Sequence, residues 1–581
     1  MSAVRTAWTG LTSRLSPLAR WLVLAGGALV LVSCFLPWAD YPGFPGKMTL
    51  SGYPGGARLH VLLLALPAAL AWRGGSGVAR ALRSASAFAL VDVLLTLLFI
   101  AFAGGGLVNV GSAIWLAVVG AALYALGAQA LTDDGTLPSR QLPRASWVPV
   151  AEILICIGVA ALGLWVFVVG LGIPASNVSN GTDYLILGAV SMNDLANESE
   201  FLSFLLMVTG LALACGRYGV TALVTGVTRQ HSRVLTAAGL VAATVFPFTQ
   251  NGNGYSLRIA ATIGVFAAAA VGLNIVVGLA GLLDLGYIAF FGVGAYFAAI
   301  FSGTASSRFH VHLPFLLVVV LGAAVSGLFG VLLGAPTLRL RGDYLAIVTL
   351  GFGEIFRITA NNLDGSSSGP RLTNGPNGVS DVPNLGLPGG FNFGDTHHAL
   401  GVELPFQANY YWLEILLVAG VMFAFMRLSE SRIGRAWVAI REDELAAAAT
   451  GINTTRLKLL AFALGATLAG AAGTVHAHVL TVAEPNSYTF IDSATLLAAV
   501  ILGGMGTVPG ALLGATVLYL LPEKLRFLHD LRLLVFGLVL VLLMRFRPEG
   551  LIVSKRRARE FHEEDGRADA LGGPVHGESM V

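Results

Sequence analysis

The sequence predicts an all-α polytopic membrane protein, and three observations support this fold class. Of the 581 residues, 55% are hydrophobic and only 12% are charged, whereas a soluble chain spends about a quarter of its residues on charge. Apolar runs of membrane-spanning length, roughly 20 residues, recur along the chain. The 72 glycines are typical of helices that approach one another closely in a bilayer. These features exclude a soluble enzyme of ordinary composition and a disordered chain.

About fifteen hydrophobic segments are predicted, in two series. Most are close to the length of roughly 20 residues that a helix needs to cross the hydrocarbon layer. The first series consists of residues 20–38, 58–72, 85–103, 112–131, 148–173, 201–227 and 234–249. The second series consists of residues 258–283, 287–303, 313–335, 344–361, 409–426, 457–480, 493–521 and 530–546.

The basic residues of the loops predict the orientation of the chain. Six Lys or Arg residues lie within 427–458, and six more lie within 545–559. Loop 362–408 has a single Arg, and loop 174–200 has no Lys or Arg. Because short cytoplasmic loops are enriched in Lys and Arg, we place the two basic segments inside and the two other loops outside.

One hydrophobic segment must then be interrupted. With both 427–458 and the tail inside, three full spans between them would leave the tail on the wrong side. Segment 493–521 contains Gly503-Gly504, Gly506 and Pro509-Gly510, and Gly and Pro interrupt membrane helices. We therefore predict that this segment is broken, either as a re-entrant segment or as two short helices.

The chain also divides into three parts by character. Residues 1–230 form a transmembrane extension with few polar groups inside its spans and no motif that indicates a role. Residues 234–553 are richer in glycine and carry all the motifs described below. Residues 554–581 mix Arg and Glu without periodicity and are expected to be a disordered cytoplasmic tail.

The most informative segment lies between two apolar runs on the basic side. It is rich in Ala, Leu and Glu, which favour helices, so residues 436–449 are predicted to be helical. Gly451 stands at or just past the end of this helix, as glycine often does. The segment is too charged to span a membrane. It is either a solvated connector or a helix that docks into a groove on a cytoplasmic partner.

Residues 444–451, Glu-Leu-Ala-Ala-Ala-Ala-Thr-Gly, resemble the Glu-Ala-Ala…Gly loop of ABC-importer permeases. Five further blocks, in order over about 320 residues, resemble the LivM-type permeases of branched-chain amino acid importers. These blocks are residues 273–296, 338–357, 373–378, 502–507 and 547–551. The resemblance identifies 234–553 as an ABC-importer permease domain and does not extend to 1–230.

The resemblance implies a permease-type helical bundle in the bacterial inner membrane, with the tail in the cytoplasm. It implies a second homologous permease subunit, two ATP-binding subunits below, and an extracytoplasmic binding protein that delivers leucine, isoleucine or valine. The chain has no Gly-x-x-x-x-Gly-Lys-Ser/Thr loop, so ATP and Mg²⁺ are expected on the partner subunits. The chain itself is then a permease and not an enzyme. The coupling helix would use Arg435, Arg441, Glu442, Asp443, Glu444, Ala447 and Gly451.

Four residues in or beside apolar segments are candidates for the translocation pathway: Asn274, Asp284, Glu354 and Arg357. Polar groups in such places are costly and are usually paired, so each either shapes a polar path or is a satisfied structural group. Glu354 and Arg357 stand at i and i+3 and can pair on one helix face, which favours the structural reading. The glycines of the first block are expected to admit a neighbouring helix, namely Gly278, Gly281, Gly286, Gly292 and Gly294.

The outer loop 362–408 is the candidate contact for the binding protein, through Asn374, Gly375, Pro376 and Asn377. Such residues predict turns, and an inert surface loop is the alternative. His397-His398 lacks further ligands, so we predict no metal site. For function as a whole, the alternatives are a permease of the same family for urea, short amides or another small polar solute. A secondary transporter or a channel is a further alternative, and neither would need an ATPase-docking loop.

Overall fold

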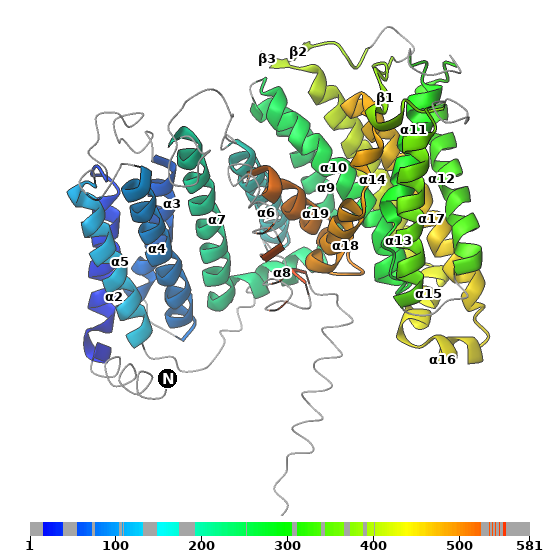
Figure 1. The fold of residues 1–581 in the computed structure, drawn as a ribbon. Helices are drawn as coiled ribbons and strands as arrows, with labels where there is room; N and C mark the ends of the chain where they lie inside the picture. Colours follow the sequence, from blue (N-terminus) through cyan, green and yellow to red (C-terminus); the bar gives the residue numbers. More distant parts are fainter. Residues whose placement is uncertain are drawn as a thin grey trace, which may run out of the picture. The chain divides into compact units, whose positions relative to one another are not determined.

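A computed structural model gives the fold of the chain, which forms two compact units. Unit 1 comprises Met1–Phe246 with Glu523–Arg532, and unit 2 comprises Pro247–Pro522 with Leu533–Val581. The structure describes residues 15–38, 55–72, 76–103, 107, 110–131, 148–172, 192–250, 252–304, 311–337, 343–364, 372–386, 392–399, 401–524, 534, 537–538, 541, 545 and 550–552. Within these ranges the fold is helical apart from two short two-stranded ribbons (Figure 1).

Unit 1 is a helical bundle in which small residues set the closest approaches. A Cβ placed on Gly120 would lie 2.9 Å from the Cβ of Leu29, and one on Gly127 would lie 2.8 Å from the nitrogen of Val23. Close backbone contact between α2 and α5 therefore depends on these glycines. The helices of unit 1 are α2 (Ala19–Ser33), α3 (Gly55–Ala65), α4 (Ser76–Ala103), α5 (Ser112–Ala130), α6 (Val148–Gly172), α7 (Met192–Tyr218), α8 (Val220–Gln230) and α9 (Ser232–Val245), with 3₁₀ turns η1 (Ser16–Leu18) and η2 (Leu66–Trp72).

Unit 2 contains the longer helical series. It begins with η4 (Phe246–Gln250), which starts at the unit boundary, and continues with α10 (Gly254–Asn274), the π-helical turn η5 (Ile275–Leu279), α11 (Tyr287–Phe301), α12 (Phe315–Thr337) and α13 (Asp343–Asn362). It then has α14 (Phe406–Glu430), α15 (Arg432–Glu442), α16 (Glu444–Ala449), α17 (Thr454–Leu480), α18 (Phe490–Gly503) and α19 (Val508–Lys524).

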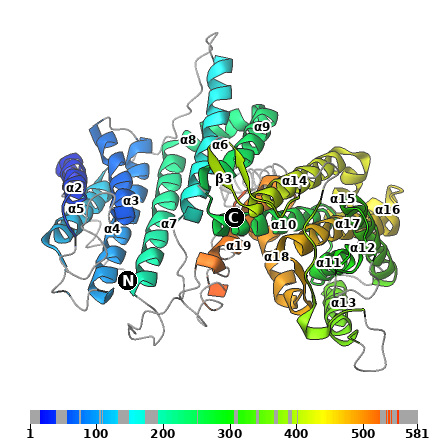
Figure 2. The same ribbon diagram turned by 90° about the horizontal axis from the view of Figure 1, so that it is seen from above.

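Helix α17 lies at the centre of unit 2 and packs against α10, α11 and α12 (Figure 2). A Cβ on Gly294 would lie 2.6 Å from the Cα of Gly470, so α11 and α17 touch backbone to backbone. Gly292 is similarly close to the ring of Phe356, which a Cβ would approach to 2.5 Å. For Gly292 and Gly294, the prediction that glycines of the first block are packing positions is confirmed.

Two ribbons and two 3₁₀ turns stand at one end of unit 2, and α15 and α16 stand at the other (Figure 1). Strand β1 (Val379–Ser380) pairs with β4 (Val482–Ala483), and β2 (His397–Ala399) pairs with β3 (Val402–Leu404), both antiparallel. The turns are η6 (Gly375–Asn377) and η7 (Pro485–Ser487). The charge bias of the loops requires segments 362–408 and 427–458 to face opposite sides, and the structure places them at opposite ends.

Nine helices in the described ranges are long and apolar enough to cross a membrane, and two shorter apolar helices accompany them. The chain is thus a multi-pass membrane protein. Of the predicted segments, 530–546 lies largely outside the described residues. Segment 201–227 is not one helix, because Gly219 adopts a φ of +90° between α7 and α8.

Segment 493–521 is broken, as predicted. Helices α18 and α19 are separated at 504–507 and run back along each other: a Cβ on Gly503 would lie 2.5 Å from the carbonyl carbon of Gly510, and one on Gly514 would lie 2.9 Å from that of Ala499. The break therefore separates two short helices that form an antiparallel hairpin, and re-entry of this hairpin into the membrane stays a prediction.

Candidate functional site

The predicted coupling segment forms two helices rather than the single helix expected over 436–449. Helix α15 ends at Glu442, and Asp443 adopts extended backbone angles of φ −153° and ψ 110°. Its Oδ1 accepts the N–H groups of Leu445 at 2.8 Å and Ala446 at 3.0 Å. Asp443 is thus the N-cap of a new helix, α16, because a short acidic side chain satisfies the free N–H groups of a first turn. Gly451 follows α16 with a φ of +87°, so its predicted place past the helix end is confirmed.

The side chains of this segment point in two directions. The Glu444 carboxylate forms an ion pair with Lys458, with 2.6 Å between Oε1 and Nζ. Ala447 is buried, so both side chains face the body of unit 2. Arg435, Glu442, Asp443 and Gly451 are exposed. The most exposed large apolar side chain of α16 is Leu445, at 69%. The predicted coupling residues do not include Leu445. A single Leu directly after three acidic residues is nevertheless a local pattern that could have indicated an exposed apolar contact.

Arg441 joins the coupling segment to the membrane helices. Its Nη1 donates to the carbonyl oxygen of Gly278, in the π-turn η5, at 2.6 Å. Gly281, which has a φ of +72°, leaves room for this side chain: a Cβ there would lie 3.0 Å from the Cβ of Arg441. Arg441 is thus anchored on its own chain and is also exposed, so its predicted contact with an ATP-binding subunit stays a prediction.

The π-turn is joined in turn to the α18–α19 hairpin by Asn274. This side chain is fully buried. Its Nδ2 donates to the carbonyl oxygen of Thr507 at 2.9 Å, and its Oδ1 accepts the N–H of Gly506 at 2.8 Å. Asn274 therefore satisfies a donor and an acceptor at the turn of the hairpin. A continuous set of contacts runs from α15 through η5 to 506–507.

The same hairpin turn receives the chain from a distant block. The N–H of Leu551 donates to the carbonyl oxygen of Leu502 at 2.7 Å, and that of Ile552 donates to Gly503 at 2.9 Å. Two blocks of the family resemblance, 502–507 and 547–551, thus meet in space.

Replacing Asn274 tests the link between η5 and the α18–α19 hairpin. Asn274→Ala removes two hydrogen bonds to the half-buried residues Gly506 and Thr507. Because each hydrogen bond contributes about 0.5–1.5 kcal/mol, we expect a loss of about 1–3 kcal/mol in the free energy of unfolding. Denaturant unfolding of the purified full chain in detergent measures this loss. Asn362→Ala, at an exposed position near the end of α13, is the matched control, with an expected change within about 0.5 kcal/mol. Equal effects of the two variants would contradict the structural role of Asn274.

Asp284 shapes the connection between η5 and α11. It is 1% exposed, and its Oδ1 accepts the N–H of Gly286 at 2.9 Å. The neighbouring N–H of Leu285 donates to Thr349 Oγ1 at 3.0 Å. Asp284 thus holds a turn against α13 and does not line the nearby pocket.

Glu354 and Arg357 form the predicted i, i+3 pair on α13. Arg357 Nε donates to Glu354 Oε2 at 3.0 Å, and Arg357 Nη2 also contacts Glu354. Arg357 Nη1 reaches Asn486 Oδ1 at 3.5 Å. The pair is nevertheless accessible, because 44% of the Glu354 side chain and 29% of the Arg357 side chain are exposed. Pairing and accessibility to a solute are therefore compatible.

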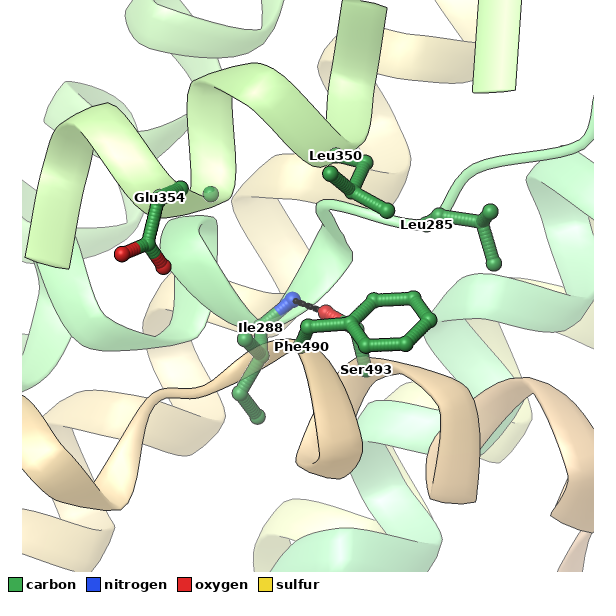
Figure 3. Close-up of a pocket in the computed structure, with 7 residues that line it drawn as sticks. Leu285, Ile288, Leu350, Glu354, Phe490 and Ser493 are labelled. Carbon is green, nitrogen blue, oxygen red and sulfur yellow. Dashed lines mark hydrogen bonds between the residues drawn. The ribbon is translucent and has the colours of Figure 1, made fainter. Parts of the chain in front are cut away.

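Glu354 also lines a pocket of about 230 Å³ between α11, α13 and α18. Figure 3 shows the Glu354 side chain at one end of the group and Leu285, Leu350 and the ring of Phe490 toward the other. The Ser493 Oγ accepts the N–H of Ile288 at 3.1 Å, which holds α18 against the start of α11. The remaining lining residues are Ile288 and Gly353. Of the four pathway candidates, only Glu354 lines this pocket, with Arg357 one turn away.

The outer candidate loop is ordered by its neighbours. Thr373 Oγ1 donates to the carbonyl oxygen of Ala360 at 2.7 Å, which ties the loop to the end of α13. Gly375 is buried, Asn374 is half-buried, and Pro376 and Asn377 are exposed. Among the four predicted contact residues, only the last two thus present a free surface.

The structure also contains several buried polar groups that the sequence does not predict. In unit 1, Ser203 Oγ donates to Asp92 Oδ2 at 3.0 Å and lies 3.1 Å from His60 Nδ1, although few polar groups were expected in these spans. In unit 2, both carboxylate oxygens of Glu414 are buried without a hydrogen-bond partner in the described residues. A lone acidic residue inside an apolar run is the signal that marks Asp92 and Glu414. Within the part of the chain that the structure describes, no three His, Cys, Asp or Glu side chains are grouped to hold a metal ion.

Residues 255–544 match the family described as the permease component of branched-chain amino acid transport systems. The chain is 39% identical over 335 residues to the high-affinity branched-chain amino acid transport system permease protein LivM of Salmonella typhimurium, covering 56% of this chain and 76% of that protein. LivM of Escherichia coli is 38% identical with the same coverage. The permease protein BraD of Pseudomonas aeruginosa is 27% identical over 303 residues, 50% of this chain and 92% of BraD. No solved structure matches the chain.

Proposed function

The chain belongs to the family of permease components of branched-chain amino acid transport systems, and from this we propose that it is the permease subunit of an ATP-driven importer of leucine, isoleucine and valine. The observation that carries the proposal is its 39% identity to LivM over three quarters of that protein. The proposed location is the bacterial inner membrane, with the tail on the cytoplasmic side.

The proposed partners follow the layout of unit 2. Two ATP-binding subunits, which use ATP and Mg²⁺, would dock on α15 and α16, where Leu445 is exposed. A second homologous permease subunit would complete the pathway. An extracytoplasmic binding protein would contact the opposite end at Pro376 and Asn377, which are exposed. We propose 234–553 as the permease domain and 1–230 as a membrane extension beyond it.

Alternating access would be driven through the contacts described above. Movement of α15 would reach η5 through the Arg441–Gly278 hydrogen bond. From η5 it would reach the α18–α19 hairpin through Asn274. Helix α18 carries Phe490 and Ser493, which line the pocket beside Glu354, so a shift of α18 changes the surface that a solute meets. Coupling of this kind would require the hairpin to adopt two arrangements, one for each state of the pathway.

Uptake by the reconstituted complex tests this function. The full chain is assembled in proteoliposomes with its ATP-binding subunits, the second permease and the binding protein. We expect ATP-dependent accumulation of leucine, isoleucine and valine. ATP-dependent uptake of urea or a short amide in their place would favour the alternative substrate class within the family. Leucine uptake that needs no ATP-binding subunits would identify a secondary transporter or a channel and overturn the proposal.

A further inference from the structure

We propose that the pocket between α11, α13 and α18, together with the Glu354–Arg357 pair, is a binding site for a zwitterionic aliphatic amino acid on its way through the permease. This inference rests on the proposed function and specifies how its substrate is recognised. The α-ammonium of the solute would lie on Glu354, its carboxylate on Arg357, and its side chain among Leu285, Leu350 and Phe490.

The position of the charged pair is the first argument. Glu354 lies near the middle of the 20 residues of α13, and both side chains of the pair are partly exposed. Charged groups at membrane depth face a bundle interior or a water-filled cavity rather than lipid. Helix α13 is not among the nine described helices that are long and apolar enough to cross a membrane. The exposed charged pair therefore indicates that this face of α13 borders water or a polar partner surface rather than lipid, as a solute pathway would.

The remaining hydrogen-bonding capacity of the pair is the second argument. Glu354 engages Arg357 through Nε and Nη2, while Nη1 makes only a 3.5 Å contact with Asn486. A guanidinium has five N–H donors, and each carboxylate oxygen has two lone pairs. An ammonium on Glu354 and a carboxylate on Arg357 can therefore bind without separating the pair. Each charge of the solute then lies against an opposite charge, the ammonium on Glu354 and the carboxylate on Arg357. A neutral solute such as urea cannot form these two ion pairs.

The pocket is the third argument. Apart from Glu354, Gly353 and Ser493, its lining consists of Leu285, Ile288, Leu350 and Phe490. Its volume of about 230 Å³ is below the roughly 300–1,000 Å³ of pockets for drug-sized ligands. An aliphatic side chain of a few carbons fits this chemistry. Because one methylene in such a pocket changes binding by about 10- to 200-fold, the pocket would discriminate by side-chain size.

Direct binding of radiolabelled leucine tests the site without the binding protein. Radiolabelled leucine is added to the purified permease complex, and a scintillation proximity assay measures how much of it binds. We expect Glu354→Gln and Arg357→Gln each to weaken leucine binding by at least about tenfold, as the loss of a hydrogen bond to a charged group predicts. Leu350→Trp should fill the pocket and weaken leucine binding similarly. Leu350→Ala should raise the affinity for phenylalanine relative to leucine.

The matched control is Ile355→Ala. Ile355 is 63% exposed on the same helix and does not line the pocket, so leucine binding should stay within about twofold. A second measurement needs no variant and covers the case that a charge variant does not fold. Leucinamide lacks the carboxylate and N-acetylleucine lacks the ammonium, so each should compete with leucine at least about tenfold more weakly on the wild-type complex.

The outcomes separate this inference from the function on which it rests. If the wild-type complex imports leucine in an ATP-dependent manner but leucinamide and N-acetylleucine compete as well as leucine, the site is wrong and the function stands. Wild-type affinity in Glu354→Gln, Arg357→Gln and Leu350→Trp would overturn the site in the same way. If the wild-type complex imports no branched-chain amino acid, the proposed function fails, and the site fails with it.

Discussion

Leu445→Asp is expected to abolish ATP-driven uptake while leaving the chain folded and inserted. Leu445 is 69% exposed on α16, and its neighbours Ala446, Ala448 and Ala449 are exposed as well. This face is apolar although it lies in a charged segment, which is the composition of a docking surface. A carboxylate in its centre would be desolvated on docking. We expect a loss of at least about 2 kcal/mol in binding of the ATP-binding subunits, roughly 30-fold.

Co-purification of the ATP-binding subunits with the full chain measures the effect, and uptake in proteoliposomes measures its consequence. Thr455→Asp is the matched control, since it adds the same charge at an exposed position in the first turn of α17, where a helix N-terminus tolerates an acid. It should leave both readouts within about twofold. Normal co-purification of the Leu445→Asp variant would show that α16 is a solvated connector, the alternative left open by its sequence.

Gly294→Leu should strongly destabilise unit 2. A Cβ at this position would lie 2.6 Å from the Cα of Gly470, and its closest approach is to the carbonyl oxygen of the same residue. Backbone atoms of α17 cannot move aside as a flexible side chain can, so α11 and α17 would have to separate. We expect a loss of about 3 kcal/mol or more in the free energy of unfolding. The measurement is the yield of monodisperse full chain in detergent together with its thermal unfolding.

Gly420→Leu makes the comparison specific. Gly420 lies on α14 with no atom within 4 Å of a Cβ, so the larger side chain meets no obstacle. Replacement of a helical glycine removes a propensity cost of about 1 kcal/mol. The control should therefore fold as well as the wild type or better. Similar yields of the Gly294→Leu and Gly420→Leu variants would mean that α11 and α17 do not touch as described.

Local patterns were sufficient for much of the fold. Apolar runs predicted nearly all the helices, because a long apolar stretch has few alternatives to a membrane helix. The Gly and Pro residues of 493–521 predicted its break, and the i, i+3 spacing predicted the Glu354–Arg357 pair. The break at Asp443 was missed although its signal was local. An aspartate before a helical run is a strong N-cap. Because helix-forming residues lie on both sides of Asp443, the pattern predicts one continuous helix instead of two.

The candidate site was predictable only in part. The hydrogen bonds of Asn274 join residues more than 230 positions apart in the sequence. Sequence periodicity cannot predict a contact between such distant residues. The hydrogen bond between Arg441 and Gly278 is unpredictable for the same reason. In the sequence, Asn274, Asp284 and Glu354 share one pattern, because all three are polar residues near apolar segments. The structure separates them, since the first two satisfy backbone groups at turns and Glu354 faces a pocket.

The sequence by itself determined the class of this protein, its membrane helices and the family of its second half, because these follow from composition, local periodicity and ordered motifs. Only the tertiary structure decided the directions of the side chains. In the structure, Glu444 and Ala447 face the body of unit 2, Leu445 is exposed, and Glu354 lines a pocket. The physical reason is that the direction of a side chain depends on which neighbour covers it. The neighbours of Glu354 come from α11 and α18, which are far apart in sequence, and even the nearer pair of Glu444 and Lys458 joins two different helices.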